Sequence, residues 1–255
     1  MTCHDDRNFD DIADHFAKKV YGSLKGQIRL AVLKRDLHTC LPNKPLHILD
    51  VGAGLAQISL DLSVNHQVII SDISQNMIDK AKEAAHKKGV NPTFIVAPYQ
   101  ELPQHLHTQK FDVILCHAVL EWLASPEDIM AFFDEYLSEG GLISLCFYNP
   151  ISLIYRNLIM GNFYQLMHPK PADKGSLTPN NPVSYDTVAG WLAARGYDIV
   201  CTSGIRVFSD YAPLKRGGLT NAEAVIEMEL KYSQTHPFWQ MGRYLHVLAK
   251  KTELR

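Results

Sequence analysis

The sequence predicts an α/β fold in which helices cover both faces of a mostly parallel, seven-stranded sheet. Short apolar runs rich in β-branched residues alternate with amphipathic helical stretches through the first 148 residues. The intervals between successive runs are short, and such alternation is typical of a doubly wound parallel sheet. Two glycines one residue apart close the first run, as in a tight strand-to-helix turn.

The first 44 residues predict a helical cap ahead of this sheet. Apolar residues recur at helical spacing from residue 9 to residue 20, and a glycine then breaks that helix. A second helix is expected from Leu24 to His38. Arg29 lies off its apolar stripe, where solvated charges are usually found. Two prolines then form a linker into the first strand.

A glycine turn follows the strand that ends at Val51. Gly52 and Gly54 have no Cβ, so backbone N–H groups there can lie flat against a ligand. The helix that begins behind them favours anions and hydrogen-bond acceptors at its N-terminus. A Gly-x-Gly pattern is weak evidence by itself, because a plain strand-to-helix turn has the same form.

An acid at the end of the second strand narrows the choice of ligand. Asp72 lies twenty residues after Gly52, where nucleoside-binding α/β domains place a carboxylate on ribose hydroxyls. NAD(P) and S-adenosylmethionine (SAM) both fit this arrangement. Gln57 stands where a dinucleotide site needs a third small residue, whereas Asp50 offers an acceptor to the methionine ammonium of SAM. The stretch therefore resembles the Asp-x-Gly-x-Gly motif of class I SAM-dependent methyltransferases, which have a Rossmann-like fold. Ala56 replaces a glycine common in that motif, and we expect Ala53 and Ala56 to keep the backbone contact if φ stays negative.

Further candidate residues follow the ends of the next two strands. Tyr99 and Gln100 come after the third strand, and a ring face and an amide suit the plane and the edge of adenine. His117 ends the fourth strand, at the carboxyl edge where such folds bind ligands. A hydrogen-bonded core histidine would have the same spacing, so both interpretations stay open.

The alternation of strands and helices continues to residue 148, pauses over residues 149–183 and then resumes. Residues 149–183 are too long for a plain connection and predict a lid-like insertion on the substrate side. Other helices are expected over 74–89, 128–137, 187–195 and 221–232, and other strands over 93–97, 111–117, 142–148, 197–208 and, antiparallel, 243–250. The single domain of 1–255 then divides into a cap (1–44), a SAM-binding core (45–148), the insertion (149–183) and the C-terminal part of the sheet (184–255).

Composition limits the partners. The net charge is −2, so a nucleic acid would have to be bound by local basic groups such as Lys34-Arg35, Lys170 with Lys174, and Lys215-Arg216. The five cysteines include no C-x-x-C pair, which favours free thiols over a metal site. The charged N-terminus has no apolar core, and no run approaches membrane-spanning length. We therefore expect a cytoplasmic protein with no membrane or metal partner.

Seven groups of residues, spread over nearly the whole chain, resemble the tRNA 5-carboxymethoxyuridine methyltransferase family. They are Arg7–Ala13, Tyr21-Gly22 with Lys25–Gln27, Phe111–Trp122, Phe147–Asn149, Gly161–Phe163, Gly204–Phe208 with Asp210-Tyr211, and Gly242–Tyr244 with His246-Val247. The resemblance implies SAM as cofactor and tRNA as substrate. The positions that fall on SAM-contacting sites of the family are Arg29, Gly52, Ala53, Asp72, Tyr99, Gln100 and His117.

The reaction implied by this resemblance is methyl transfer to the carboxylate of 5-carboxymethoxyuridine at the wobble position of tRNA. A desolvated anion needs a fixed cation, and Arg206, expected in the strand over 197–208, is our candidate. A structural ion pair between Arg206 and Asp210 is the alternative. Tyr148 and Asn149, at a strand end, are candidates for neutral hydrogen bonds to the acceptor.

Three other functions stay open or are disfavoured at this point. A methyltransferase for a quinone, lipid or metabolite would have the same core motifs. A binding-only SAM sensor would have them too. A nicotinamide oxidoreductase is disfavoured by Gln57 and Asp50.

Overall fold

All seven strands form one sheet. The computed structural model describes residues 23–168, 179, 181–212 and 216–252. Strand order is β3-β2-β1-β4-β5-β7-β6, and β7 runs antiparallel to both of its neighbours. The strands are β1 (His47–Val51), β2 (Gln67–Asp72), β3 (Thr93–Val96), β4 (Phe111–His117), β5 (Leu137–Tyr148), β6 (Tyr197–Ile205) and β7 (Tyr244–Lys251). The predicted α/β fold, with its antiparallel last strand, is confirmed. The helix expected over 9–20 lies outside the described residues.

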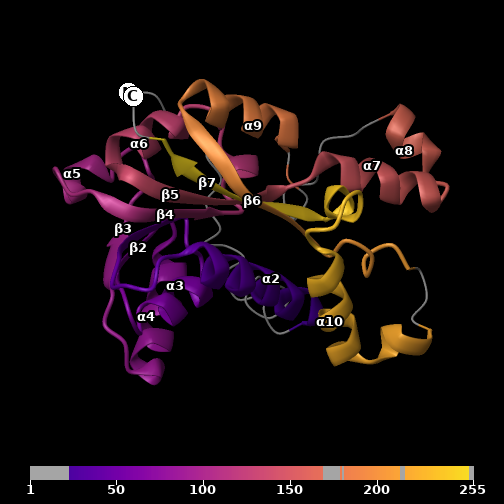
Figure 1. The fold of residues 1–255 in the computed structure, drawn as a ribbon, viewed down its shortest axis with the longest axis horizontal. Coiled ribbons are helices and arrows are strands. Elements are labelled where there is room, and N and C mark those ends of the chain that lie inside the picture. The colour runs from indigo at the N-terminus through magenta and orange to yellow at the C-terminus, as the bar shows by residue number, and fades with distance from the viewer. Residues whose placement is uncertain (1–22, 169–178, 180, 213–215, 253–255) are drawn as a thin grey trace.

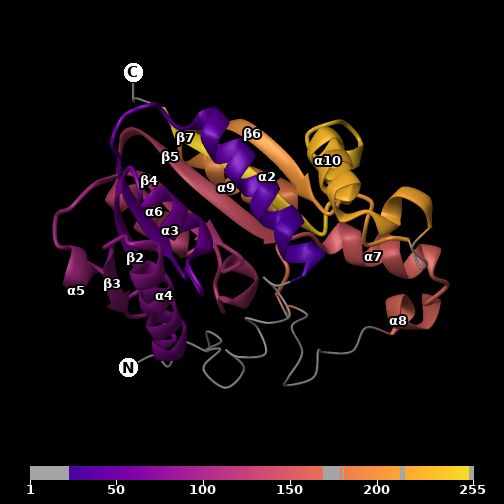
Figure 2. The same cartoon turned by 90° about the horizontal axis from the view of Figure 1, so that it is seen from below.

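Helices cover both faces of this sheet (Figures 1 and 2). One face carries α2 (Leu24–Cys40), α3 (Gln57–Leu62), α4 (Gln75–Lys88) and α10 (Ala222–Tyr232). The other carries α5 (Pro103–Leu106), α6 (Ile129–Tyr136) and α9 (Tyr185–Ala194). Short 3-10 helices among the described residues are η3 (Leu120–Trp122), η4 (Gly217–Thr220) and η5 (Phe238–Met241).

The central strands are apolar on both sides because each face is buried. Along β4, Val113 and Leu115 point into the core under α2, whereas Ile114 and Cys116 point into the core under α6. A strand buried on both faces reads as a continuous apolar run rather than as an alternating pattern. This explains why the core strands could be recognised from short apolar runs.

The insertion after β5 contains α7 (Pro150–Ile159) and α8 (Phe163–Met167), which extend beyond the edge of the sheet (Figure 1). Residues 169–178 and 180 of the insertion are not among those described. Several large apolar side chains on these two helices are exposed, among them Ile154, Phe163 and Met167. No helix in the described ranges is long and apolar enough to cross a bilayer.

The predicted strand over 197–208 is wrong at its C-terminal end. β6 stops at Ile205, and Arg206 adopts a left-handed conformation with φ of 62°. The backbone N–H of Val207 then donates to the carboxylate of Glu229 at 2.7 Å, and the N–H of Ser209 does so at 3.0 Å. These N–H groups bind a buried side chain of α10 instead of continuing the strand ladder, so Arg206 lies in a turn.

Candidate active site

The ends of the parallel strands bring the predicted site residues to one edge of the sheet. β1, β2, β4 and β5 are mutually parallel, so Gly52, Asp72, His117 and Tyr148 all lie at their carboxyl ends. β7 begins at the same edge, where Tyr244 pairs with Tyr148. Ligands of open α/β sheets bind outside this edge.

The glycine turn after β1 has the backbone that a close ligand contact requires. Gly52 and Gly54 have φ of 68° and 55°, a region that favours glycine. A Cβ at Gly52 would overlap Val119, whereas a Cβ at Gly54 would meet nothing within 4 Å. Ala53 keeps a negative φ as expected, but Ala56 does not, since its φ is 54°. The space beside Gly54 is therefore open, and a side chain at this position would occupy it.

Asp72 connects the end of β2 to this turn. Its Oδ2 accepts from the N–H of Gly54 at 2.7 Å, and its Oδ1 accepts from the N–H of Ser74 at 2.8 Å. These bonds fix the carboxylate, which is 8% exposed, beside the glycine turn. A carboxylate has about four lone-pair sites, so it can accept from ribose hydroxyls as well.

Asp50 provides a buried acceptor beneath the turn. Its Oδ2 accepts from the hydroxyl of Ser59, and its Oδ1 has no hydrogen-bond partner in the described part of the chain. Burial raises the pKa of Asp50 to about 7, the hydrogen bond from Ser59 opposes this, and the charge of Asp72 adds to it. A buried carboxyl with one unmatched oxygen suits a cationic ligand such as the methionine ammonium of SAM.

Arg29 is not a surface charge. Although it lies off the apolar stripe of α2, that helix crosses the sheet and leaves Arg29 only 9% exposed. Its Cζ lies 5.2 Å from the centre of the Tyr244 ring, and its positive charge acts on Asp50 and His117. The guanidinium is therefore close to the residues that would contact the amino-acid end of SAM.

Tyr99 and Gln100 follow β3 at the same edge. The Tyr99 ring packs edge-on against Phe132, with the two ring centres 6.0 Å apart. Both Tyr99 and Gln100 are half-buried, so this packing fixes the Tyr99 ring without enclosing it. The adenine contacts expected from the sequence for these two residues stay a prediction.

His117 begins a buried chain of hydrogen bonds across the sheet. Its Nε2 lies 2.8 Å from the hydroxyl of Ser144, which lies 2.8 Å from Nε2 of His246, whose Nδ1 lies 2.7 Å from Asp36. Burial lowers the pKa of His117 well below its ordinary value, so the ring is neutral. The structure thus satisfies His117 as a core histidine and also places it at the ligand edge. His246 and Asp36 were missed because nothing local in the sequence connects them to His117.

The three residues expected on the acceptor side differ in what they contact. Tyr148 is 2% exposed, and its hydroxyl has no partner within the described residues. Asn149 uses its amide within the fold, donating to the carbonyls of Gln240 and Gly242 at 2.8 and 2.9 Å. Arg206 forms an ion pair with Asp210, with Nη1 and Oδ2 3.1 Å apart. This is the structural ion pair that the sequence left as the alternative.

Two further groups at this edge were not singled out from the sequence. Glu121 is 1% exposed, neither of its carboxyl oxygens has a partner in the described ranges, and burial raises its pKa to about 7. Arg243 has a buried Nη1 that is likewise unmatched, and its Cζ lies 4.9 Å from the centre of the Tyr148 ring. Both belong to segments that resemble the methyltransferase family, but the resemblance did not indicate which residues of those segments contribute to the site.

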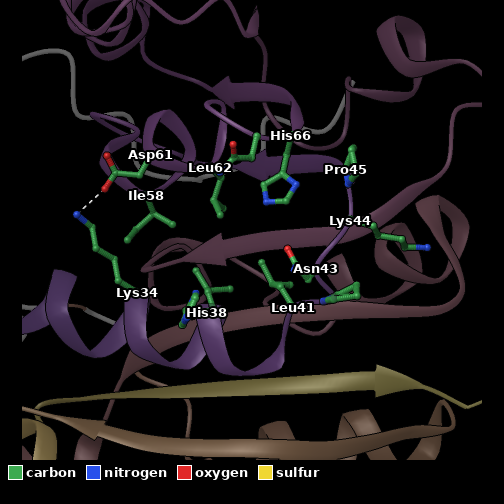
Figure 3. Close-up of a pocket in the computed structure, with 13 residues that line it drawn as sticks. Lys34, His38, Leu41, Asn43, Lys44, Pro45, Ile58, Asp61, Leu62 and His66 are labelled. Carbon is green, nitrogen blue, oxygen red and sulfur yellow. Dashed lines mark ion pairs between the residues drawn. The ribbon is translucent and has the colours of Figure 1, made fainter.

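A separate cavity of about 710 Å³ lies at the opposite edge, between the end of α2, the following loop and α3. Figure 3 shows His38, Leu41 and His66 around it, with Lys34 paired to Asp61. These residues lie at the amino ends of β1 and β2, away from the glycine turn. The described residues include no group of three or more His, Cys, Asp or Glu side chains that could hold a metal ion.

Known proteins share both the sequence and the fold of this chain. A methyltransferase-domain family model matches residues 42–176. The tRNA 5-carboxymethoxyuridine methyltransferase of Escherichia coli (strain K12) is 41% identical, covering 97% of each chain. A ubiquinone biosynthesis O-methyltransferase of Coxiella burnetii (strain RSA 493 / Nine Mile phase I) is 25% identical over 68% of this chain and 70% of its own.

Solved structures extend the fold comparison. The PH0226 protein from Pyrococcus horikoshii OT3 is similar with a TM-score of 0.63 at 15% identity, covering 96% of this chain and all of that one. The plantazolicin methyltransferase BamL, solved with a triazolic desmethylPZN analog and SAH, has a TM-score of 0.62 at 16% identity. The BamL comparison covers 95% of this chain and 91% of that one. At these identities the structures establish the fold alone.

Proposed function

This chain belongs to the tRNA 5-carboxymethoxyuridine methyltransferase family, and we propose that it methylates the carboxylate of 5-carboxymethoxyuridine at the wobble position of tRNA. It is a SAM-dependent methyltransferase with the class I fold. The observation that carries the substrate assignment is 41% identity over 97% of the chain to relatives with that name. The product would be the methyl ester.

The residues at the carboxyl edge fit SAM in an extended pose. Asp72 would accept from the ribose hydroxyls, and Tyr99 and Gln100 would contact adenine. The turn at Gly52 and Ala53 would lie against the amino-acid end. Four side chains would lie around the sulfonium and the charged groups of the amino-acid end of SAM, namely Arg29, Asp50, His117 and Glu121. The fit rests on the unmatched Oδ1 of Asp50 and on the open space beside Gly54.

The proposed methyl transfer does not require the protein to move a proton. Bound SAM supplies a methyl group on a positively charged sulfur. A carboxylate has a pKa of about 4 and is already ionised at neutral pH, so no general base is needed. One carboxylate oxygen forms a bond to the methyl carbon while the carbon–sulfur bond breaks and its electron pair stays on sulfur. The site contributes by aligning these atoms and by holding the anion out of water.

We assign the acceptor side of the site to the ends of β5 and β6. Tyr148 would donate a hydrogen bond from its unmatched hydroxyl. Arg206 would contribute positive charge, which its ion pair with Asp210 partly offsets. Asn149 would act indirectly, because its amide ties the end of β5 to the backbone before β7.

The proposal can be tested by incubating the purified protein with labelled SAM and tRNA. We expect label in tRNA that carries 5-carboxymethoxyuridine, in a form that mild base releases as an ester. Matched tRNA without the modification should remain unlabelled. A parallel incubation with phenols and quinone precursors tests the alternative that the ubiquinone-pathway relative raises. Label in the small molecules but not in modified tRNA would favour that alternative.

A further inference from the structure

We propose that Arg243 and Tyr148 together bind the carboxylate that accepts the methyl group, with Arg206 acting on it only at longer range. This inference rests on the proposed function and names the residues that select a charged acceptor. The sequence had pointed to Arg206 as the cation for the acceptor. The structure favours Arg243 and Tyr148 instead, because each has a buried donor with no partner within the described residues.

The first support is a pair of buried donors in contact with each other. The Arg243 guanidinium lies over the Tyr148 ring at 4.9 Å, and Nη1 of the arginine and the hydroxyl of the tyrosine are both buried and unmatched in the described chain. Leaving such groups without a partner is costly, and more so for a charged group than for a neutral one. A guanidinium can only donate, so the ligand that satisfies Arg243 must be an acceptor.

The second support is the charge around Tyr148. Burial raises the pKa of the Tyr148 phenol, so it stays protonated at neutral pH and can donate. Arg243, Arg206 and Arg156 all act on this phenol as positive charges, and Asp210 acts as a negative one. Asp210 is paired with Arg206 at 3.1 Å and with Lys25 at 3.7 Å. The local excess of positive charge therefore remains at Arg243 and favours an anion there.

The third support is the rigid placement of Arg243. Its backbone N–H donates to the carbonyl of Ile205 at 2.8 Å, and its carbonyl accepts from the N–H of Asn149 at 3.1 Å. Gly242, just before it, packs so closely that a Cβ there would lie 2.6 Å from the Cα of Gly204. Backbone bonds to the ends of β5 and β6 thus position Arg243 before any acceptor arrives, which lowers the entropy cost of binding.

The fourth support connects this pair to the cofactor residues. The Tyr148 ring packs edge-on against the Tyr244 ring, with centres 5.6 Å apart. The Cζ of Arg29 lies 5.2 Å from the centre of that same Tyr244 ring. Tyr244 therefore packs against both Tyr148 of the acceptor pair and Arg29, the residue expected to bind the methionine carboxylate. The acceptor and the methyl donor can then meet across one aromatic side chain.

The chemistry of the product agrees with this arrangement. Methylation converts the carboxylate to a neutral ester, which can no longer form a bidentate ion pair with a guanidinium. The pair would therefore bind the substrate more tightly than the product and would favour product release.

The test compares the affinity of anticodon stem-loops that differ only in charge at the wobble uridine. One carries 5-carboxymethoxyuridine and the other its neutral methyl ester, and both are titrated in the presence of S-adenosylhomocysteine. Wild-type protein should bind the acid about 10- to 100-fold more tightly than the ester. Arg243→Gln should reduce this preference to within about threefold while the affinity for the ester stays unchanged. Tyr148→Phe should lose part of the preference, and Arg206→Gln should lose less than Arg243→Gln.

Arg195→Gln is the matched control. It also removes a guanidinium, but Arg195 pairs with Asp134 just before β6, at the opposite edge of the sheet. The proposal is wrong if Arg243→Gln keeps the preference, or if Arg206→Gln abolishes it while Arg243→Gln does not. If Arg243→Gln fails to fold, Arg243→Lys and Tyr148→Phe decide, since both should reduce the preference. Wild-type protein that binds the two stem-loops equally well would also overturn the proposal, whereas wild-type protein that binds neither stem-loop would count against the proposed function.

Discussion

Asp72 is the residue whose role can be isolated most cleanly. Asp72→Ala removes a carboxylate from the proposed ribose contact, and charged hydrogen bonds contribute about 1.5–3 kcal/mol. SAM affinity measured by calorimetry should therefore fall by about 10- to 100-fold. Asp79→Ala, which removes an exposed acid from α4, is the control and should leave the affinity unchanged. Equal affinities for the two variants would remove Asp72 from the site.

Two buried carboxyls should make SAM binding depend on pH. Asp50 and Glu121 each have a pKa of about 7, with burial as the main cause. A bound ammonium favours their ionised forms, so below pH 7 binding must release protons. SAM affinity should fall as pH drops below about 7, by about tenfold per pH unit for each carboxyl that ionises on binding. Calorimetry in buffers of different ionisation enthalpy measures the released protons.

Asp50→Asn provides the contrast for this pH dependence. The variant cannot lose a proton at that position, so its affinity for SAM should be weaker and less sensitive to pH than wild type. An unchanged pH profile in Asp50→Asn would show that Asp50 stays neutral when SAM is bound.

Sequence predicted some of these residues and missed others for a physical reason. Gly52 directly follows β1 and Asp72 ends β2, the neighbouring parallel strands of one local strand–helix–strand unit, so spacing alone predicted that they would lie at the same edge of the sheet. The unmatched donor of Arg243 depends on where β5, β6 and β7 end relative to one another, and no local pattern encodes that. The helical spacing alone favoured a solvated Arg29, and only the family resemblance indicated a SAM contact. Local spacing does not show which elements cover a residue, and Arg29 is in fact 9% exposed.

At the scale of elements, the glycine turn makes a prediction about stability. Gly52→Ala combines a left-handed φ with overlap against Val119, whereas Gly54→Ala has the φ penalty alone. The φ strain costs about 1–2 kcal/mol in either case, and overpacking adds about 1–3 kcal/mol at Gly52. Urea denaturation should thus find Gly52→Ala the less stable of the two variants. Equal stability would mean that Val119 moves aside without cost.

The elements themselves were largely predictable, but their ends were not. The periodicity of apolar residues depends on neighbours along the chain, and it located each described helix and strand that carries the site. The end of β6 depends instead on Glu229, which lies 22 residues later in the sequence and accepts a hydrogen bond from the N–H of Val207. A long-range acceptor of this kind leaves no trace in the local pattern, which is why Arg206 was assigned to a strand.

At the scale of the whole molecule, binding of tRNA should depend only modestly on salt. The net charge is −2, and some basic side chains are already engaged in interactions within the protein. Arg35 is bound to Asp36 and to the carbonyl of Leu230, and Lys34 is paired with Asp61. With about three to five phosphates neutralised, the slope of log affinity against log salt should lie between about −2 and −4. A slope near zero would argue against phosphate contacts.

The central claim, that the acceptor is a carboxylate, is tested most directly by single-turnover kinetics on modified tRNA. SAM is held at saturation, so the pH dependence of its binding does not enter. Since the acceptor is ionised well below neutral pH, the rate of the chemical step should be nearly flat from about pH 6 to about pH 9, with the methyl ester as product. A rate that climbs about tenfold per pH unit over that range would mean that the acceptor must first lose a proton, and would contradict the account.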